Sequence, residues 1–236
     1  TLHYFMGGIR VDNDSQMTKV PGLFACGECA GGMHGANRLG GNSLSDLLVF
    51  GWLAGKGAAS YVNGLESAPQ LNPESVHAAR KQAIAPLNRE SGDNPYLVHE
   101  GLQDIMHEGC NIIREGKGTG EAVERLQGIK ERIANVRSPG ASQYNPGWHE
   151  ALALNSMIII AEAVARAAHM REESRGAHTR LDFQGEHAEW STVNLVIRKG
   201  ANGEMEIEKV DRGDPDPELA GIARSTLEDL EGGIHV

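Results

Sequence analysis

The 236-residue sequence lacks the cysteines of a disulfide framework and the basic runs of a nucleic-acid-binding protein. Its three cysteines are Cys26, Cys29 and Cys110, of which only the first two are neighbours, and this favours a reducing, intracellular compartment. The formal net charge is −10, and Lys and Arg form no long run. A general affinity for a phosphate backbone is therefore not expected, and nucleic acid is excluded as a partner.

Long apolar segments are also lacking. The longest candidate, residues 156–168, is interrupted by Glu162 and Arg166 and falls short of the ~18 residues of a membrane helix. This predicts that the chain does not cross a bilayer. No signal peptide is present, and the sequence starts at Thr1 inside an expected strand, so we expect a fragment of a longer chain.

The amino-terminal region predicts the end of an α/β domain. Residues 1–12 and 20–30 read as short strands around a polar turn, and the apolar run that ends at Gly27 is typical of a buried strand. A helix is expected from Asn42 or Ser43, either of which is a good N-cap, to about residue 61.

The middle of the chain predicts a small helical bundle. Helical segments are expected at residues 73–90, 95–114, 119–136 and 146–172. In the third segment four apolar residues keep helical spacing and indicate a buried face: Val123, Leu126, Ile129 and Ile133. Segments of this length with short connections are expected to pack against one another.

The carboxyl-terminal pattern changes to period two. Alternating apolar residues on both sides of Asn202-Gly203 predict a hairpin, and residues 215–230 predict an acidic surface helix. The expected fold class is therefore α/β plus α, with a small α+β domain at the end. We expect domains at residues 1–62, 73–173 and 176–236.

The glycine-rich stretch between Cys26 and Leu44 is the most informative segment. A zinc site needs four ligands, and a dithiol redox pair usually starts a helix, so two small residues at a strand end are the better interpretation of Cys26 and Cys29. No nucleotide-binding glycine fingerprint fits. What remains is a loop that lets backbone approach a ligand, with Arg38 in its middle and a helix amino terminus behind it.

Four blocks in this order carry a resemblance: HYFMGGI at residues 3–9, VPGLFACGECA at 20–30, HGANRLGGNSLSDLLVFG at 34–51 and REESRGAHTRLDF at 171–183. Together they resemble the succinate dehydrogenase/fumarate reductase flavoprotein family. The resemblance covers most of the chain, from His3 to about Phe183, and corresponds to the carboxyl-terminal part of that subunit.

The resemblance implies five site residues. His3 would contact a carboxylate of the dicarboxylate substrate, and Arg38 would clamp a substrate carboxylate, for which its planar fork is suited. Glu28 would contact FAD, and the amides of Ser43 and Leu44 would meet the pyrimidine edge of the flavin, where a helix amino terminus stabilises negative charge. An isolated histidine or arginine is more often structural, but here the motif context favours a substrate role.

The resemblance also implies a reaction and partners. The expected activity is the interconversion of succinate and fumarate by hydride transfer with FAD, within the tricarboxylic acid cycle and electron transport. Electrons would pass to an iron–sulphur subunit, whose clusters lie in that partner, and on to quinone. The flavoprotein would be peripheral, held through membrane anchor subunits on the cytoplasmic side of the membrane or on the mitochondrial matrix side. The general acid/base would be an arginine upstream, so we expect no catalytic residue and no metal site in this chain.

Two other interpretations stay open. L-aspartate oxidase, a related soluble flavoenzyme, shares HGANR and an ESRG block, although the residues after its arginine typically differ from those here. A non-catalytic truncated module is the second. For Arg175, His178 and Arg180 we expect an interdomain hydrogen-bond and charge network near the cofactor rather than direct catalysis.

Overall fold

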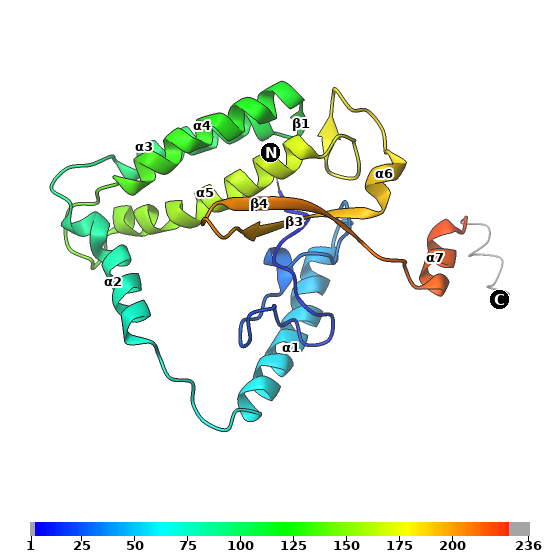
Figure 1. The fold of residues 1–236 in the computed structure, drawn as a ribbon, viewed down its shortest axis with the longest axis horizontal. Coiled ribbons are helices and arrows are strands. Elements are labelled where there is room, and N and C mark those ends of the chain that lie inside the picture. The colour runs from blue at the N-terminus through cyan, green and yellow to red at the C-terminus, as the bar shows by residue number, and fades with distance from the viewer. Residues whose placement is uncertain (1–2, 227–236) are drawn as a thin grey trace. The chain divides into compact units, whose positions relative to one another are not determined.

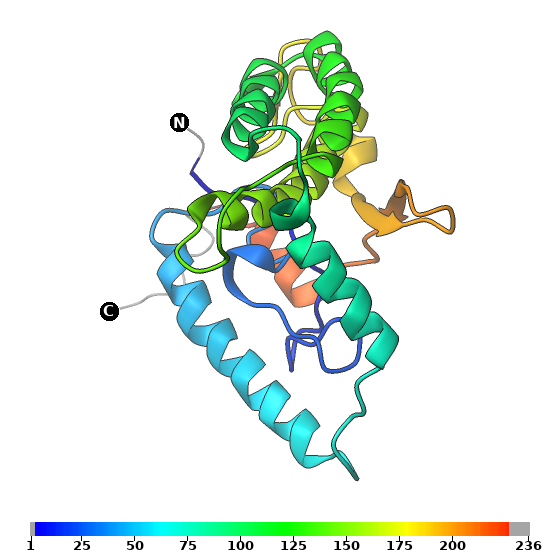
Figure 2. The ribbon, with the colours of Figure 1, turned by 90° about the vertical axis from the view of Figure 1, so that its left-hand side faces the viewer.

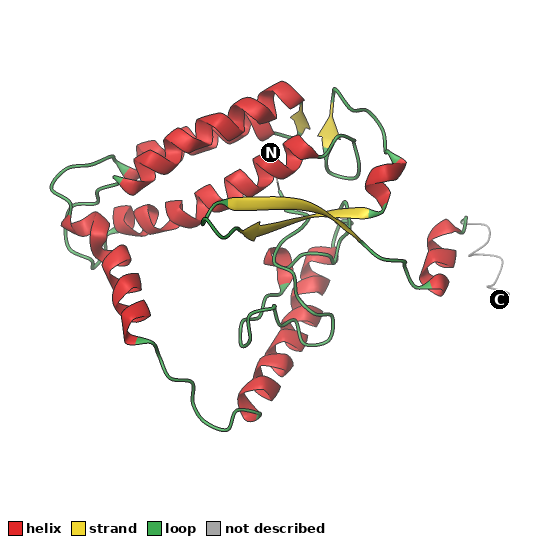
Figure 3. Ribbon diagram, viewed as in Figure 1, coloured by secondary structure: helices red, strands yellow, loops and turns green. Residues whose placement is uncertain are grey.

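The computed structural model describes residues 3–226 and divides into two compact units, with the boundary between Glu186 and His187. The first unit contains η1, α1–α5, β1 and β2, and the second contains α6, β3, β4 and α7 (Figure 1). Most of the regular structure is helical, and the sheets of the described residues are two-stranded (Figure 3). The expected fold class, α/β plus α with a small α+β domain, is thus shown only in part: the described chain is mostly helical with small sheets, and the three-domain division stays a prediction.

The two amino-terminal strands are a wrong prediction. In the described part of these segments, pairing is limited to single bridges, Ile9 with Ala30 in parallel and Met17 with Phe24 in antiparallel orientation. The expected buried strand leads instead into a short 3-10 helix, η1 (Gly27–Cys29). Two segments that pair only with each other form a marginal sheet, which explains why their strand-like composition does not give a continuous ladder.

Helix α1 (Asn42–Asn63) is confirmed, but its N-cap is not the predicted one. Gly41 occupies that position with φ 85°, a left-handed conformation that glycine adopts without strain, and no side chain caps the helix. Part of the expected apolar side is exposed, with Leu44 70% and Leu48 76% accessible. The helix therefore presents both a free amino terminus and an uncovered apolar surface within the described chain.

The helical bundle is confirmed. It consists of α2 (Pro73–Asn88), α3 (Pro95–Cys110), α4 (Gly116–Ala134) and α5 (Pro146–Met170), of which α3, α4 and α5 lie side by side (Figures 1 and 2). One continuous apolar core joins these three helices: Val98, Leu102, Ile105, Cys110, Ala122, Leu126, Ile129, Ile133, Val136, Ala151, Leu154, Ile158, Ala161 and Ala165. Burial of this surface is the main stabilising contribution to the first unit.

Helices α2, α3 and α5 begin in the same way. Each starts with a proline, and the preceding residue, Asn72, Asn94 or Asn145, accepts a hydrogen bond from a first-turn amide. Helix α3 ends at Cys110, earlier than expected, because Arg114 belongs to β1 (Ile113–Arg114), which pairs in parallel with β2 (Thr179–Arg180).

Of the helices in residues 3–226, α5 alone is long and apolar enough to cross a membrane, which corrects the expectation that no apolar segment reaches that length. It is the helix against which α3 and α4 both pack, with Leu154 and Ala165 fully buried. Its buried Glu162 is paired with Lys130 of α4 at 2.7 Å. These contacts are those of a core helix in a bundle, and the absence of a membrane span stays a prediction.

The second unit contains the predicted hairpin. Strands β3 (Val193–Lys199) and β4 (Met205–Asp211) pair antiparallel from Val193 opposite Asp211 to Lys199 opposite Met205. The short helix α6 (Ala188–Ser191) carries the buried Trp190. Helix α7 (Pro217–Arg224) matches part of the expected tail helix, whose last residues, 227–230, lie outside the described residues.

Candidate functional site

A cluster of three polar side chains joins the HYFMGGI and HGANR segments. The Asp46 carboxylate, on the first turns of α1, accepts a hydrogen bond from the Tyr4 hydroxyl at 3.2 Å and lies 3.1 Å from Nε2 of His34. The Tyr4 hydroxyl is also 3.3 Å from the same His34 nitrogen. Partial burial raises the pKa of the Tyr4 phenol, and the Asp46 carboxylate raises it further. The cluster therefore fixes the segment that contains His3 to the start of α1.

Arg38 lies against this cluster. Its guanidinium carbon is 4.5 Å from the centre of the Tyr4 ring, a cation–π contact, and its Nη1 donates to the Leu39 carbonyl at 3.1 Å. Its Nε is buried and has no hydrogen-bond partner among the described residues. A buried donor without a partner is costly, so Arg38 is a held cation with an unmet capacity to bind an acceptor.

Glu28 has a structural contact that the sequence does not predict. One of its carboxylate oxygens accepts the backbone N–H of Phe5 at 2.9 Å. The backbone N–H of Ile9 donates to the Cys29 carbonyl at 2.8 Å, so η1 and the HYFMGGI segment are joined at two places. Glu28 thus helps to position the segment of His3 and Tyr4, and its expected contact with FAD stays a prediction.

The start of α1 has the donor set expected of an anion-facing helix terminus. Ser43 and Leu44 lie in its first turn, no side chain caps it, and a Cβ atom placed on Gly41 would meet nothing within 4 Å. The Asn42 N–H donates to the Leu39 carbonyl at 3.2 Å, and the amides of Ser43 and Leu44, without a side-chain cap, can face a ligand carrying partial negative charge. This donor set suits the electron-rich pyrimidine edge of FAD, and the contact of Ser43 and Leu44 with that edge stays a prediction.

The five predicted residues are brought together only in part. Glu28 and Arg38 are linked to one another through Phe5 and Tyr4, and Ser43 and Leu44 share the first turn of α1 with Asp46. His3 precedes Tyr4 in the chain and is exposed. Its contact with a substrate carboxylate stays a prediction.

Sequence reasoning missed the cluster of Tyr4, His34 and Asp46. All three lie inside the quoted blocks, but none was assigned a role, because their contacts link residues 30 and 42 positions apart. The available signal was the presence of two polar side chains besides the predicted ones, His34 in the glycine-rich loop and Asp46 near the start of the helix that follows it.

A second group of charged residues surrounds the ESRG block. Glu173, fully buried, accepts hydrogen bonds from Arg171 and Arg175, and Arg175 also bonds the exposed Glu186 at 2.9 Å. Arg180, 2% exposed, pairs with Asp182 through two parallel bonds of 2.8 Å. These residues form a hydrogen-bond and charge network inside the first unit, while the expected interdomain character of the network and its proximity to the cofactor stay predictions.

His178 is held as a neutral imidazole in this group. Nη1 of Arg114 donates to its Nδ1 at 2.8 Å, which leaves the proton on Nε2, 3.2 Å from the Arg171 carbonyl. Burial lowers the pKa of His178, and the nearby charges of Arg114, Arg180 and Arg171 lower it further, against the hydrogen bond to the carbonyl.

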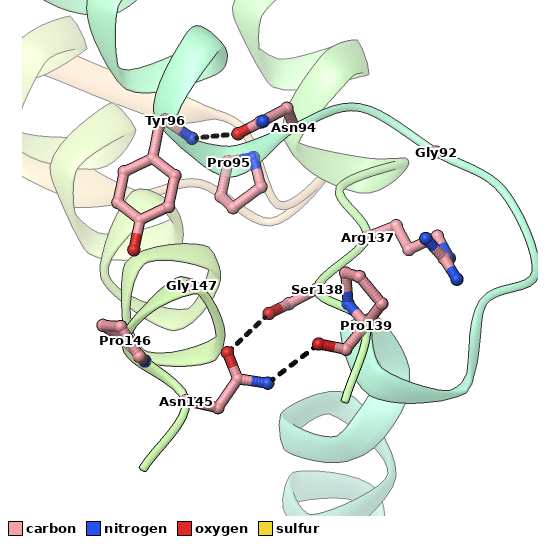
Figure 4. Close-up of a pocket in the computed structure, with 10 residues that line it drawn as sticks. All are labelled: Gly92, Asn94, Pro95, Tyr96, Arg137, Ser138, Pro139, Asn145, Pro146 and Gly147. Carbon is pink, nitrogen blue, oxygen red and sulfur yellow. Dashed lines mark hydrogen bonds between the residues drawn. The ribbon is translucent and has the colours of Figure 1, made fainter. Parts of the chain in front are cut away.

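A pocket at the amino-terminal ends of α3 and α5 is lined by residues outside the candidate site (Figure 4). It is lined by Tyr96 and Arg137 and by the N-caps Asn94 and Asn145, whose side-chain oxygens are already bound within the chain. None of the five predicted site residues lines it. Within residues 3–226 no group of three His, Cys, Asp or Glu side chains is arranged to hold a metal ion.

Comparison with known families shows which family the chain belongs to. Residues 99–219 match the family described as fumarate reductase flavoprotein C-term, and residues 1–44 match an FAD binding domain. The first match covers more than half of the sequence. The chain belongs to the succinate dehydrogenase/fumarate reductase flavoprotein family. Residues 1–44 include all five predicted site residues.

The chain is similar both to relatives named as fumarate reductases and to relatives named as succinate dehydrogenases. The fumarate reductase flavoprotein subunit of Escherichia coli is 39% identical over 77% of this chain and 31% of its own length. The succinate dehydrogenase flavoprotein subunit of Bacillus subtilis is 34% identical over 83% of this chain and 34% of its own. The solved structure of Mycobacterium smegmatis Sdh1 in complex with UQ1 has a TM-score of 0.88 at 44% identity, covering 97% of this chain and 39% of that one.

The chain thus spans about a third of the length of the curated relatives that it matches. The family binds FAD, and the matched region is its carboxyl-terminal portion. The family membership confirms the resemblance seen in the sequence blocks.

Proposed function

We propose that this chain supplies the dicarboxylate-binding part of a flavoprotein that interconverts succinate and fumarate. The observation that carries the proposal is Arg38, a cation held on the Tyr4 ring with an unmet buried donor, a few residues before the uncapped start of α1. When bound, FAD supplies the two-electron acceptor or donor. The protein's task is to hold both carboxylates so that hydrogen is removed from, or added to, the two central carbons.

Each side chain has a stated part in this task. Arg38 binds one substrate carboxylate through its planar fork, and His3 donates a hydrogen bond to a carboxylate. Tyr4, which follows His3, and His34, in the loop of Arg38, both contact Asp46. These contacts position His3 and Arg38 relative to the start of α1. The amides of Ser43 and Leu44, together with Glu28, face FAD. The general acid/base is an arginine outside this sequence.

The proposed partners follow from the family. Electrons pass between the flavoprotein and an iron–sulphur subunit, and from there to a quinone through membrane anchor subunits, which makes the flavoprotein a peripheral component. Relatives named as fumarate reductases and as succinate dehydrogenases match this chain at 39% and 34% identity, so similarity alone does not choose the physiological direction.

The test is a substrate comparison on the full-length holoenzyme. We expect reduction of an artificial acceptor with succinate and oxidation of a reduced donor with fumarate, with L-aspartate inactive. Turnover of L-aspartate without turnover of succinate would assign the chain to the oxidase-type reaction instead. Absence of bound flavin and of any dicarboxylate effect on thermal stability would favour a non-catalytic module.

A further inference from the structure

A tight turn at Gly176 contacts the loop that carries Arg38. The backbone N–H of Ala177 donates to the carbonyl of Ala36 at 3.0 Å. Ala36 lies two residues before Arg38 in the HGANR segment, whereas Gly176 and Ala177 belong to the ESRGAH segment far along the chain. The hydrogen bond therefore joins two of the four family blocks through their backbones.

This approach requires glycine at position 176 for two reasons. Gly176 has φ +57°, a left-handed conformation that other residues rarely adopt. A Cβ atom there would also lie 2.2 Å from the Ala36 carbonyl oxygen and 2.7 Å from the Ala36 side chain. Any side chain at 176 must displace the Arg38 loop or the turn itself.

The turn is the more firmly held of the two partners. Its ends are joined by two backbone bonds between Arg175 and His178, of 2.8 and 3.0 Å. The Arg175 side chain is bound to the buried Glu173, and His178 is bound to Arg114 and to the Arg171 carbonyl. Apart from this contact, the backbone bonds of the loop within residues 3–226 are local, such as Asn37 N–H to the His34 carbonyl at 3.2 Å, and its side-chain support comes from His34 on Asp46 and Arg38 on the Tyr4 ring.

We propose that the Gly176 turn is a positioning element for Arg38: it fixes the Ala36 carbonyl and thereby sets the affinity of the site for dicarboxylates. The inference rests on the proposed function, because it assigns the turn to the same substrate site. The charge network around Glu173 then acts on substrate binding through the turn, without touching substrate or cofactor. A small displacement of Arg38 is sufficient, since misplacement by about 1 Å can cost roughly a hundredfold in rate.

The test compares Gly176→Ala with Gly213→Ala in the full-length holoenzyme. Gly213 also has a positive φ, +76°, but a Cβ atom there would meet nothing within 4 Å, so the control carries similar backbone strain without the contact. The probe is malonate, a dicarboxylate that has no central carbon–carbon bond to oxidise. We expect Gly176→Ala to weaken malonate binding and to raise the KM for succinate by about tenfold or more, with a smaller change in kcat, and Gly213→Ala to leave both constants near wild type.

A second measurement uses the unmodified holoenzyme and does not depend on a variant that folds. Because coupling between two sites is reciprocal, malonate should increase the protection of residues 174–180 against hydrogen exchange. Equal malonate affinity in both glycine variants, or unchanged protection of that segment, would overturn the inference. A wild-type holoenzyme that neither binds malonate nor turns over succinate would overturn the proposed function instead, so the two failures are distinguishable.

Discussion

The guanidinium of Arg38 lies 4.5 Å from the centre of the Tyr4 ring, and the hydroxyl of the same tyrosine donates to Asp46. The cation that would bind substrate is thus supported by an aromatic face, and that face is fixed by a buried carboxylate. Positioning of this kind is what a site needs when it must hold two carboxylates in one orientation.

Asp46→Asn tests this support. Burial and the Asp46 carboxylate both raise the pKa of Tyr4; the substitution keeps the size of the side chain and removes the second cause, so the pKa of Tyr4 should fall. We also expect the KM for succinate to rise by about tenfold, or ~1.4 kcal/mol, with little change in kcat. The pKa of Tyr4 is measured from the pH dependence of the phenolate absorbance of Asp46→Asn, with Tyr4→Phe as the reference that lacks this phenol.

Asp104→Asn is the matched control for that prediction. Asp104 is an exposed residue of α3 outside the candidate site, so its replacement should leave the tyrosine titration and the kinetics unchanged. A KM for the Asp46 variant equal to that of the control would remove Asp46 from the site.

The buried Glu173 should be essential to the ESRG network. Glu173→Gln removes the charge that pairs with Arg171 and Arg175 while both arginines remain largely buried, and we expect a loss of about 3 kcal/mol in the free energy of unfolding. The exposed Glu186, which pairs with Nη1 of Arg175, serves for comparison. Glu186→Gln should lower the free energy of unfolding by no more than about 1 kcal/mol. Chemical denaturation of both variants gives the difference; equal losses would contradict the network as described.

His178 should make stability depend on pH. Its folded-state pKa is lowered, so between that value and the unfolded value of about 6.5 the unfolded chain binds more protons. Its contribution to stability is therefore fully present above about pH 6.5 and is lost as pH falls through the folded-state pKa. Thermal unfolding from neutral to mildly acidic pH should show a shallower loss for His178→Gln than for wild type. His77→Gln, at an exposed position of α2, should keep the wild-type slope.

The sequence predicts the helices and the hairpin well because their determinants are local. Proline after asparagine marks the start of three helices, apolar spacing marks the buried face of α4, and Asn202-Gly203 marks the hairpin turn. The two amino-terminal strands fail because pairing depends on neighbours that composition does not reveal. The preference of Asn and Ser for N-cap positions favours Asn42 or Ser43 as the cap of α1. The helix starts at Asn42, so the cap position falls on Gly41.

The candidate site is predictable as a set of motifs but not as a geometry. The blocks identify Arg38 and the start of α1, whereas the Tyr4–Asp46 and Ala177–Ala36 hydrogen bonds join residues distant in sequence and follow only from the folded chain. Glu28 illustrates the same limit, since its observed partner, the Phe5 amide, is a backbone group that no side-chain pattern reveals.

The most direct test of the central claim is the dissociation constant of malonate from the full-length holoenzyme, measured by calorimetry for wild type, Arg38→Ala and Arg38→Lys. Loss of the guanidinium leaves a substrate carboxylate without its charged partner, so we predict a loss of about a hundredfold, or ~3 kcal/mol, for alanine. Lysine should restore only part of it, because a point charge does not replace a planar fork. Malonate affinity in Arg38→Ala equal to that of wild type would contradict the account.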